Sequence, residues 1–374
     1  MVSRLHGLDS LTRVVIKIGS ALLTDNGAGL NEQAIEQWVK PMADMSKQGV
    51  EVVLVSSGAV AVGMQAMGWQ KRPTALAQLQ AAAAVGQAGL MQTYQSQFKE
   101  YNQHTAQVLL TQDDLANRKR YLNVRETLNA LLALKVLPVV NENDVVANEE
   151  LCFGDNDQLA AMVATIIQAD LLIILTDQDG MYDKNPRQYP DAQLIHEIDC
   201  QNTSLLTMAG EGGALGRGGM ISKVKAARLA GENGIPTVIA GGHTPEVLSK
   251  ILAGEHMGTL MTTSAHTLAA HQQWLNQLPI TDGYVTIKQA VIDTLKSQLD
   301  SVCVRDIQAV AGFFGEGDII YICNNLGQRL FKGLCGVKSS DLSKICGLNE
   351  DEAFAVLGYR LNQVVIKHCD LVKV

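Results

Sequence analysis

Short apolar runs alternate with longer helical segments from residue 12 to about residue 262. The runs expected as strands are Arg13–Ile18, Glu51–Ser56, Ala106–Thr111, Val136–Val140, Leu171–Thr176 and Thr237–Ala240. The segments expected as helices are Asn31–Gln48, Ala75–Phe98, Lys119–Leu134, Asn156–Gln168 and Ile221–Asn233. Near-continuous apolar strands separated by helices are typical of a mostly parallel sheet covered on both faces. We therefore predict an α/β fold, a three-layer sandwich with a mostly parallel central sheet.

The alternation stops in residues 263–280, which we interpret as a linker. The strands expected after it are shorter and separated by glycines: Tyr284–Ile287, Asp318–Cys323, Leu330–Val337 and Val364–Lys367. A chain of 374 residues is long enough for two domains. The pattern thus predicts a large domain over residues 1–262 and a small mixed β domain over residues 281–374.

Composition narrows the class of protein. With 47% hydrophobic and 18% charged residues, the chain is typical of a soluble globular protein. Its net charge of −8 offers no general attraction to nucleic acid or to an anionic membrane. The seven cysteines form no CxxC pair, and no leader or membrane span is evident. We therefore expect reduced thiols, no zinc site and a cytoplasmic location.

Clusters of polar and glycine residues lie at the C-terminal ends of the predicted strands. Lys17–Ser20, Ser56–Ala59, Asn141–Asp144 and Thr176-Asp177 follow the first, second, fourth and fifth strands, and Gly154–Asp157 introduces the helix before the fifth. Each cluster alone has an ordinary interpretation as a solvated charge, a helix cap or a turn. In open parallel sheets, however, ligands bind at the edge where the carboxyl ends of the strands meet. The convergence on that edge favours a ligand site.

A glycine-rich segment, Gly210–Gly219, leads into a helix that starts Met220-Ile221-Ser222-Lys223. Such a loop brings backbone N–H groups close to phosphate oxygens, although a plain surface loop would have the same composition. The sequence contains no GxxxxGK[ST] motif, and no GxGxxG follows a strand. We expect Lys223 to lie exposed at the start of this helix.

The run TDQDGMY at 176–182, followed by Asn185-Pro186-Arg187, resembles the nucleotide-binding segment of the amino acid kinase family. That family includes aspartokinases, acetylglutamate kinases, uridylate kinases and carbamate kinases. VVIKIGS, VLVSSGAVAVG, VLPVVNENDVV and FGDNDQLAA most resemble members that phosphorylate the side-chain carboxylate of free L-glutamate, the first step of proline biosynthesis. The region from about residue 281 resembles the PUA domain that bacterial members of this kind carry.

This resemblance implies a role for each matching residue. Lys17 and Lys223 would stabilise the phosphoryl group in transit, and Asp157 would orient the two lysines. The residues implied to bind ATP are Lys17, Gly19, Ser20, Thr176, Asp177, Arg217, Gly218, Gly219, Met220, Ile221, Ser222 and Lys223. Those implied to bind glutamate are Ser57, Gly58, Asp144, Asp155 and Asn156. The cofactors implied are ATP and Mg²⁺, without an identified protein ligand for the metal.

The chemistry agrees with this reading independently. A carboxylate nucleophile is already ionised at neutral pH, so no catalytic base is needed. The remaining task is positioning and charge neutralisation around the phosphoryl group, which lysines, Mg²⁺ and loop amides perform.

Two segments depart from the family pattern. The loop usually reads GTGGMxTK, whereas Arg217 stands here for the first threonine and Ser222 for the second. A guanidinium can take over a phosphate contact from a hydroxyl. The segment Ser297–Ile307 lacks the Pro and Gly typical of the PUA domain.

Two alternatives remain open from the sequence. One is a kinase for a different acid, such as acetylglutamate or aspartate. The other is an RNA-binding protein, because PUA domains often bind RNA. Residues 281–374 carry ten Lys and Arg against eleven Asp and Glu, a net charge of −1 that gives no electrostatic footprint for RNA. The resemblance further implies a homo-oligomer and feedback inhibition by proline.

Overall fold

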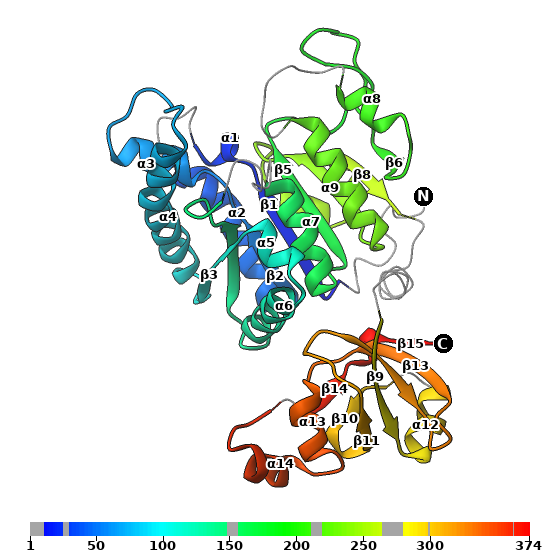
Figure 1. The fold of residues 1–374 in the computed structure, drawn as a ribbon. Coiled ribbons are helices and arrows are strands. Elements are labelled where there is room, and N and C mark those ends of the chain that lie inside the picture. The colour runs from blue at the N-terminus through cyan, green and yellow to red at the C-terminus, as the bar shows by residue number, and fades with distance from the viewer. Residues whose placement is uncertain are drawn as a thin grey trace. The chain divides into compact units, whose positions relative to one another are not determined.

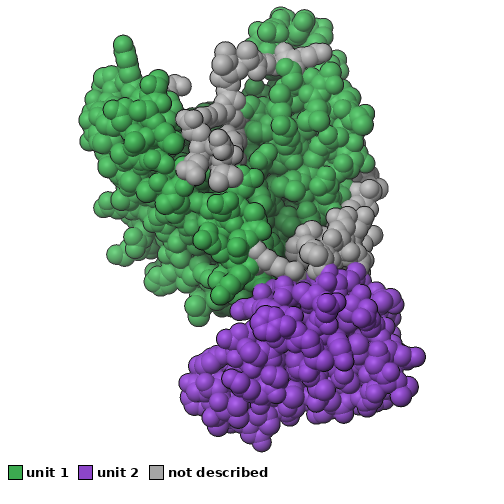
Figure 2. Space-filling model, viewed as in Figure 1, with its two compact units in different colours: residues 1–266 green, residues 267–374 purple. Residues whose placement is uncertain are grey.

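A computed structural model describes residues 11–24, 30–147, 156–210, 219–263, 280–297, 300–361 and 363–374. The chain divides into two compact units, residues 1–266 and residues 267–374 (Figure 2). All of the predicted linker except residues 263 and 280 lies outside the described residues.

The larger unit contains an eight-stranded sheet with the order β3-β4-β2-β1-β5-β7-β8-β6. Neighbouring strands run parallel except for the antiparallel pair β7 and β8. The strands are β1 (Arg13–Ile18), β2 (Glu51–Val55), β3 (Thr105–Leu110), β4 (Leu137–Glu142), β5 (Leu171–Thr176), β6 (Glu197–Asp199), β7 (Thr237–Gly241) and β8 (Thr259–Thr262). The predicted mostly parallel sheet is confirmed.

Helices cover both faces of this sheet (Figure 1). Those packed on the face that carries Val15 are α5 (Gln112–Ala116), α6 (Arg118–Ala133), α7 (Asn156–Ile167), α8 (Leu205–Gly210) and α9 (Met220–Glu232). Those packed on the face that carries Ile16 are α1 (Ser20–Leu23), α2 (Glu32–Lys47), α4 (Leu76–Lys99) and α10 (Val247–Leu252). The remaining helix, α3 (Ala59–Ala66), packs along α4. The three-layer sandwich is therefore confirmed.

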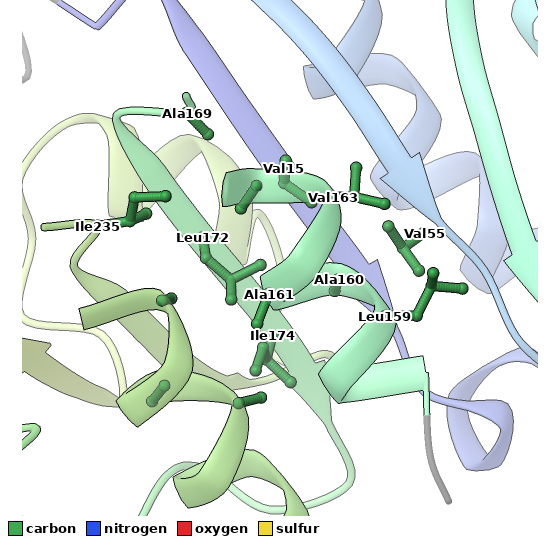
Figure 3. Close-up of a cluster of buried hydrophobic side chains, with 14 of the residues drawn as sticks. Val15, Val55, Leu159, Ala160, Ala161, Val163, Ala169, Leu172, Ile174 and Ile235 are labelled. Carbon is green, nitrogen blue, oxygen red and sulfur yellow. The ribbon is translucent and has the colours of Figure 1, made fainter. Parts of the chain in front are cut away.

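Alternation along the strands sends successive side chains into two cores. In β1, Val15 belongs to the core beneath α7 and α9, whereas Ile16 belongs to the core beneath α2 and α4. Figure 3 shows the first of these cores, in which Val163 of α7 lies near Val15 of β1 and Leu159 of α7 lies near Val55 of β2. Lys17 is two residues beyond Val15, so its side chain faces the same helices. The packing of α7 thus determines which side chains contact Lys17.

The structure differs from the sequence prediction mainly at short elements. Thr111, expected to end a strand, instead caps α5 through a reciprocal hydrogen-bond pair with Asp114. The short strands β6 and β8 were not expected, because three or four residues are too few to show an alternating pattern.

The smaller unit contains a five-stranded mixed sheet with the order β11-β9-β12-β13-β15 and a two-stranded sheet of β10 and β14. Its strands are β9 (Ile280–Ile287), β10 (Val302–Cys303), β11 (Ile307–Ala311), β12 (Ile319–Cys323), β13 (Arg329–Leu334), β14 (Val364–Ile366) and β15 (Leu371–Lys373). Its helices are α12 (Gln289–Ser297), α13 (Ser339–Ile345) and α14 (Glu350–Leu357), with single 3₁₀ turns η2 (Val304–Asp306) and η3 (His368–Asp370). The small mixed β domain is confirmed, with three helices that the prediction lacked.

Among the described residues, no helix combines the length and the apolar character needed to cross a bilayer. The cysteines whose side chains are described are free thiols: Cys200, Cys303, Cys323, Cys335 and Cys346. Burial raises the pKa of the Cys335 thiol to about 12, so this thiol stays protonated at neutral pH.

Candidate active site

The carboxyl ends of β1, β2, β4 and β5 meet at one edge of the sheet. Lys17 of β1 is in register with Val55 of β2 and with Ile174 of β5. The chain runs from β1 outward to β2, β3 and β4, and then returns to the other side of β1 as β5. Such a reversal of strand order opens a crevice where ligands bind in α/β sheets. The predicted convergence of strand-end motifs therefore occurs at the topological switch point.

Asp157 lies at the centre of this edge. It is the second residue of α7 and is fully buried. Its Oδ1 forms an ion pair with Lys17 Nζ, and its Oδ2 lies 3.0 Å from Lys223 Nζ. Ser222 Oγ also donates to Oδ2, at 2.8 Å. One carboxylate thus holds side chains from β1 and α9, which are far apart in the sequence.

This buried cluster has a net positive charge. Two ammonium groups and one carboxylate sum to +1, and the side chains of Lys17 and Lys223 are only 3% and 6% exposed. The first turns of α7 and α9 meet here, and helix N-termini add partial positive charge. The arrangement favours an anion such as a polyphosphate. Lys223 is buried, so the expectation that it lies exposed was wrong.

A second cluster, built from side-chain amides, lies beside the first. Asn156 Nδ2 donates to the Ser56 carbonyl at 2.5 Å, to Asn141 Oδ1 at 2.8 Å and to Ser57 Oγ at 3.2 Å. Ser57 and Asn156, both predicted to bind the acceptor substrate, are therefore brought together. Because Asn156 precedes Asp157 in α7, the amide cluster and the lysine cluster share one helix start.

Two glycines shape the ends of β1 and β2. Gly58 precedes α3 with φ +93°, a left-handed conformation that L side chains rarely adopt. Gly19 precedes α1, its N–H donates to the Leu175 carbonyl at 3.2 Å, and Ser20 begins the helix exposed. A side chain at Gly19 would begin 3.9 Å from Lys17 Nζ. At Gly19, the absence of a side chain leaves space beside the Lys17 ammonium group.

Asp144 lies in the turn after β4 and is half-buried. Burial raises the pKa of its carboxyl group, an effect that the charge of Arg72 opposes. A carboxylate kept in a partly dehydrated place is suited to bind a cation such as a substrate ammonium group.

The end of β5 supplies Thr176 and Asp177. Thr176 is buried, and its hydroxyl donates to Asp177 Oδ1 at 3.1 Å. Asp177 also forms an exposed ion pair with Arg187, at 3.3 Å. At the start of α9, Gly219 and Ile221 are exposed and Met220 is half-buried.

Three predicted site residues, Asp155, Arg217 and Gly218, lie outside the described residues. Conversely, the sequence analysis assigned no role to Gln87 or Tyr94 of α4, which contact the amide cluster from behind. Both are buried polar residues in a helix whose composition is otherwise typical of packing. Their polarity at inward helical positions was the available signal.

No group of three or more His, Cys, Asp or Glu side chains suited to hold a metal ion occurs within the described ranges. The positive groups at the sheet edge suit phosphate oxygens.

The fold and the edge cluster define a phosphotransferase-like α/β protein, and comparison with known families agrees. The model of the amino acid kinase family matches residues 12–241. The chain belongs to the amino acid kinase family.

Curated relatives refine this classification. A protein from Pseudomonas fluorescens named glutamate 5-kinase is 47% identical over 363 residues, covering 97% of this chain and 98% of the relative. A protein of the same name from Teredinibacter turnerae is 49% identical over 348 residues, covering 93% of each chain.

Among solved structures, a UMP kinase from Bacillus anthracis has a TM-score of 0.48 at 16% sequence identity. The match covers 68% of this chain and 97% of that chain.

Proposed function

We propose that this protein is a glutamate 5-kinase, which transfers the γ-phosphoryl group of ATP to the side-chain carboxylate of L-glutamate. The observation that carries the proposal is the buried pair of lysines, Lys17 and Lys223, held by Asp157. The names of relatives that match almost the whole chain support glutamate as the acceptor.

The proposed mechanism is one of positioning and charge neutralisation. The acceptor carboxylate is ionised at neutral pH and attacks the γ-phosphorus, while the bond from phosphorus to the bridging β–γ oxygen breaks and ADP leaves. Lys17 and Lys223 would neutralise charge on the transferring group. Asp157 binds both ammonium groups and would act as a positioning residue for them. Mg²⁺ would enter as the MgATP complex.

The remaining assignments follow the two clusters. Ser57, Gly58, Asp144 and Asn156 would bind glutamate. The groups proposed to bind ATP are Gly19, Ser20, Thr176, Asp177, Gly219, Met220, Ile221 and Ser222. Asp155, on the glutamate side, and Arg217 and Gly218, on the nucleotide side, stay predictions from the sequence. So do assembly as a homo-oligomer, inhibition by proline, a cytoplasmic location and the PUA character of the small unit.

The test is a coupled assay of ADP release with L-glutamate, N-acetyl-L-glutamate and L-aspartate as acceptors. Hydroxylamine added to the reaction should convert the acyl phosphate product to a hydroxamate, which separates phosphorylation of a carboxylate from plain hydrolysis of ATP. We expect kcat/KM to be highest for L-glutamate. A higher kcat/KM for either other acid, or ADP release without hydroxamate, would contradict the proposal.

A further inference from the structure

Behind the amide cluster lies a buried side chain that the proposed mechanism does not use. Gln87, in the middle of α4, is 8% exposed, and its Oε1 accepts a hydrogen bond of 2.7 Å from Asn141 Nδ2. Asn141, at the end of β4, is 2% exposed. A buried polar side chain whose partner borders a ligand site needs a physical account.

The hydrogen bonds around Asn141 define which way its amide points. Its Oδ1 accepts from the Glu142 N–H at 2.9 Å and from Asn156 Nδ2 at 2.8 Å. If the Asn141 amide were turned over, its NH₂ group would face two donors, and its oxygen would face the Gln87 oxygen. Gln87 therefore stabilises the orientation that presents an oxygen to Asn156.

The orientation of Asn141 sets that of Asn156 in turn. The Nδ2 group of Asn156 faces three acceptors: the Ser56 carbonyl, Ser57 Oγ and Asn141 Oδ1. Its Oδ1 consequently lies on the opposite side of the amide. Among the described residues, this oxygen accepts no hydrogen bond. Asn156 is half-buried, and an amide oxygen in this state can accept a hydrogen bond from a ligand.

We infer that Gln87 is a positioning residue for substrate selection, acting through Asn141 and Asn156. The chain of three amides presents the Asn156 oxygen as a fixed acceptor for the ammonium group of the amino-acid substrate. The inference rests on the proposed function and names a residue that supplies its specificity. Tyr94 lies two helical turns after Gln87 in α4. Its hydroxyl is hydrogen-bonded to Ser56 Oγ, at the end of β2, at 3.0 Å.

The experiment compares Gln87→Met with Gln87→Glu in the full-length chain. Methionine keeps the length of the side chain but lacks a strong acceptor, whereas glutamate keeps an oxygen for Asn141 Nδ2. Gln95→Leu, an exposed substitution in the same helix, is the matched control. If Gln87→Met fails to fold, Gln87→Ala makes the same comparison with room for a water molecule.

Gln87→Met should raise the KM for L-glutamate about five- to fiftyfold, the effect of leaving one buried donor without its partner. The KM for MgATP should stay within about twofold, and Gln87→Glu should restore most of the loss. Glutarate, which lacks the ammonium group, should inhibit wild type and Gln87→Met with Ki values within about twofold of each other, because no donor then meets the Asn156 oxygen.

Three outcomes would overturn the inference in an active wild-type enzyme: an unchanged KM for glutamate, a Ki for glutarate that rises in parallel, or no rescue by Gln87→Glu. A parallel rise would mean that Gln87 only packs the site. A wild-type enzyme without glutamate-dependent ADP release would instead remove the proposed function, and this inference with it. The glutamate-dependent ADP release of the wild-type enzyme therefore distinguishes failure of the proposed function from failure of the inference about Gln87.

Discussion

The ammonium groups of Lys17 and Lys223 are bound by the two oxygens of a single carboxylate, that of Asp157. Lys17 comes from the first strand and Lys223 from the helix α9, so their distance is set by neither segment alone. A buried carboxylate between two cations holds both at a defined separation. In the proposed function, this arrangement would provide two fixed positive charges for one phosphoryl group.

Lys223→Ala should lower kcat by at least about a hundredfold, the loss typical of one preorganised charged donor. The protein should still fold, because Asp157 keeps Lys17 as its partner. Steady-state kinetics of a variant checked by circular dichroism measures this. Lys225→Ala, an exposed position in the same helix, is the control and should keep its activity. Near-normal turnover in folded Lys223→Ala would remove Lys223 from the mechanism.

Asp157→Asn should lower the free energy of unfolding by about 3–5 kcal/mol, because it removes the carboxylate from a buried ion pair. Urea unfolding at neutral pH provides the measurement. Asp177→Asn breaks the exposed pair with Arg187 and should change the same quantity by less than about 1 kcal/mol. Equal effects of the two substitutions would show that the Asp157 cluster does not behave as a buried pair.

Asp144→Asn should raise the KM for glutamate about ten- to a hundredfold while the KM for ATP stays almost unchanged. The substrate ammonium group would lose its charged partner, whereas the nucleotide site would keep all of its groups. Initial rates with each substrate varied in turn measure both constants. A parallel change in the two values would contradict an ammonium-binding role for Asp144.

The same substitution makes a prediction about stability against pH. Burial raises the folded-state pKa of Asp144, so its ionised form opposes folding. The stability from this group is present below its ordinary pKa and is lost as the pH rises through the raised value. Asp144→Asn should therefore be at least as stable as wild type at neutral pH, and any gain should vanish at acidic pH. Melting curves at several pH values test this, and a variant less stable at neutral pH would indicate that Asp144 mainly supports its turn.

A chain that ends after His266 should fold and phosphorylate glutamate. The contact pattern makes residues 1–266 a compact unit, and every described group of the proposed site belongs to it. ADP release by the purified fragment, compared with the full chain, measures this. A soluble, folded fragment without activity would mean that the smaller unit completes the site.

Much of the fold could be predicted from the sequence, because the apolar runs of strands and the periodicity of helices are both local patterns. The apolar runs of β1 and β5 have the length and β-branched content of buried strands, and the helices between them are long enough to show their period. The short strands β6 and β8 and the 3₁₀ turns carry too few residues for such a pattern. Their pairing depends on neighbours that are distant in the chain.

The candidate site divides in the same way. The sequence by itself determined which polar residues end the strands, and the rule for parallel sheets brings those ends to one edge. Only the tertiary structure decided that Lys223 is buried against Asp157 and that Gln87 reaches Asn141 from α4. Burial and side-chain pairing depend on how helices pack over the sheet, and this packing sums many weak contacts between distant segments. The positions of the long strands and helices along the chain follow from local patterns, whereas the partners of a charged side chain depend on how distant segments pack together.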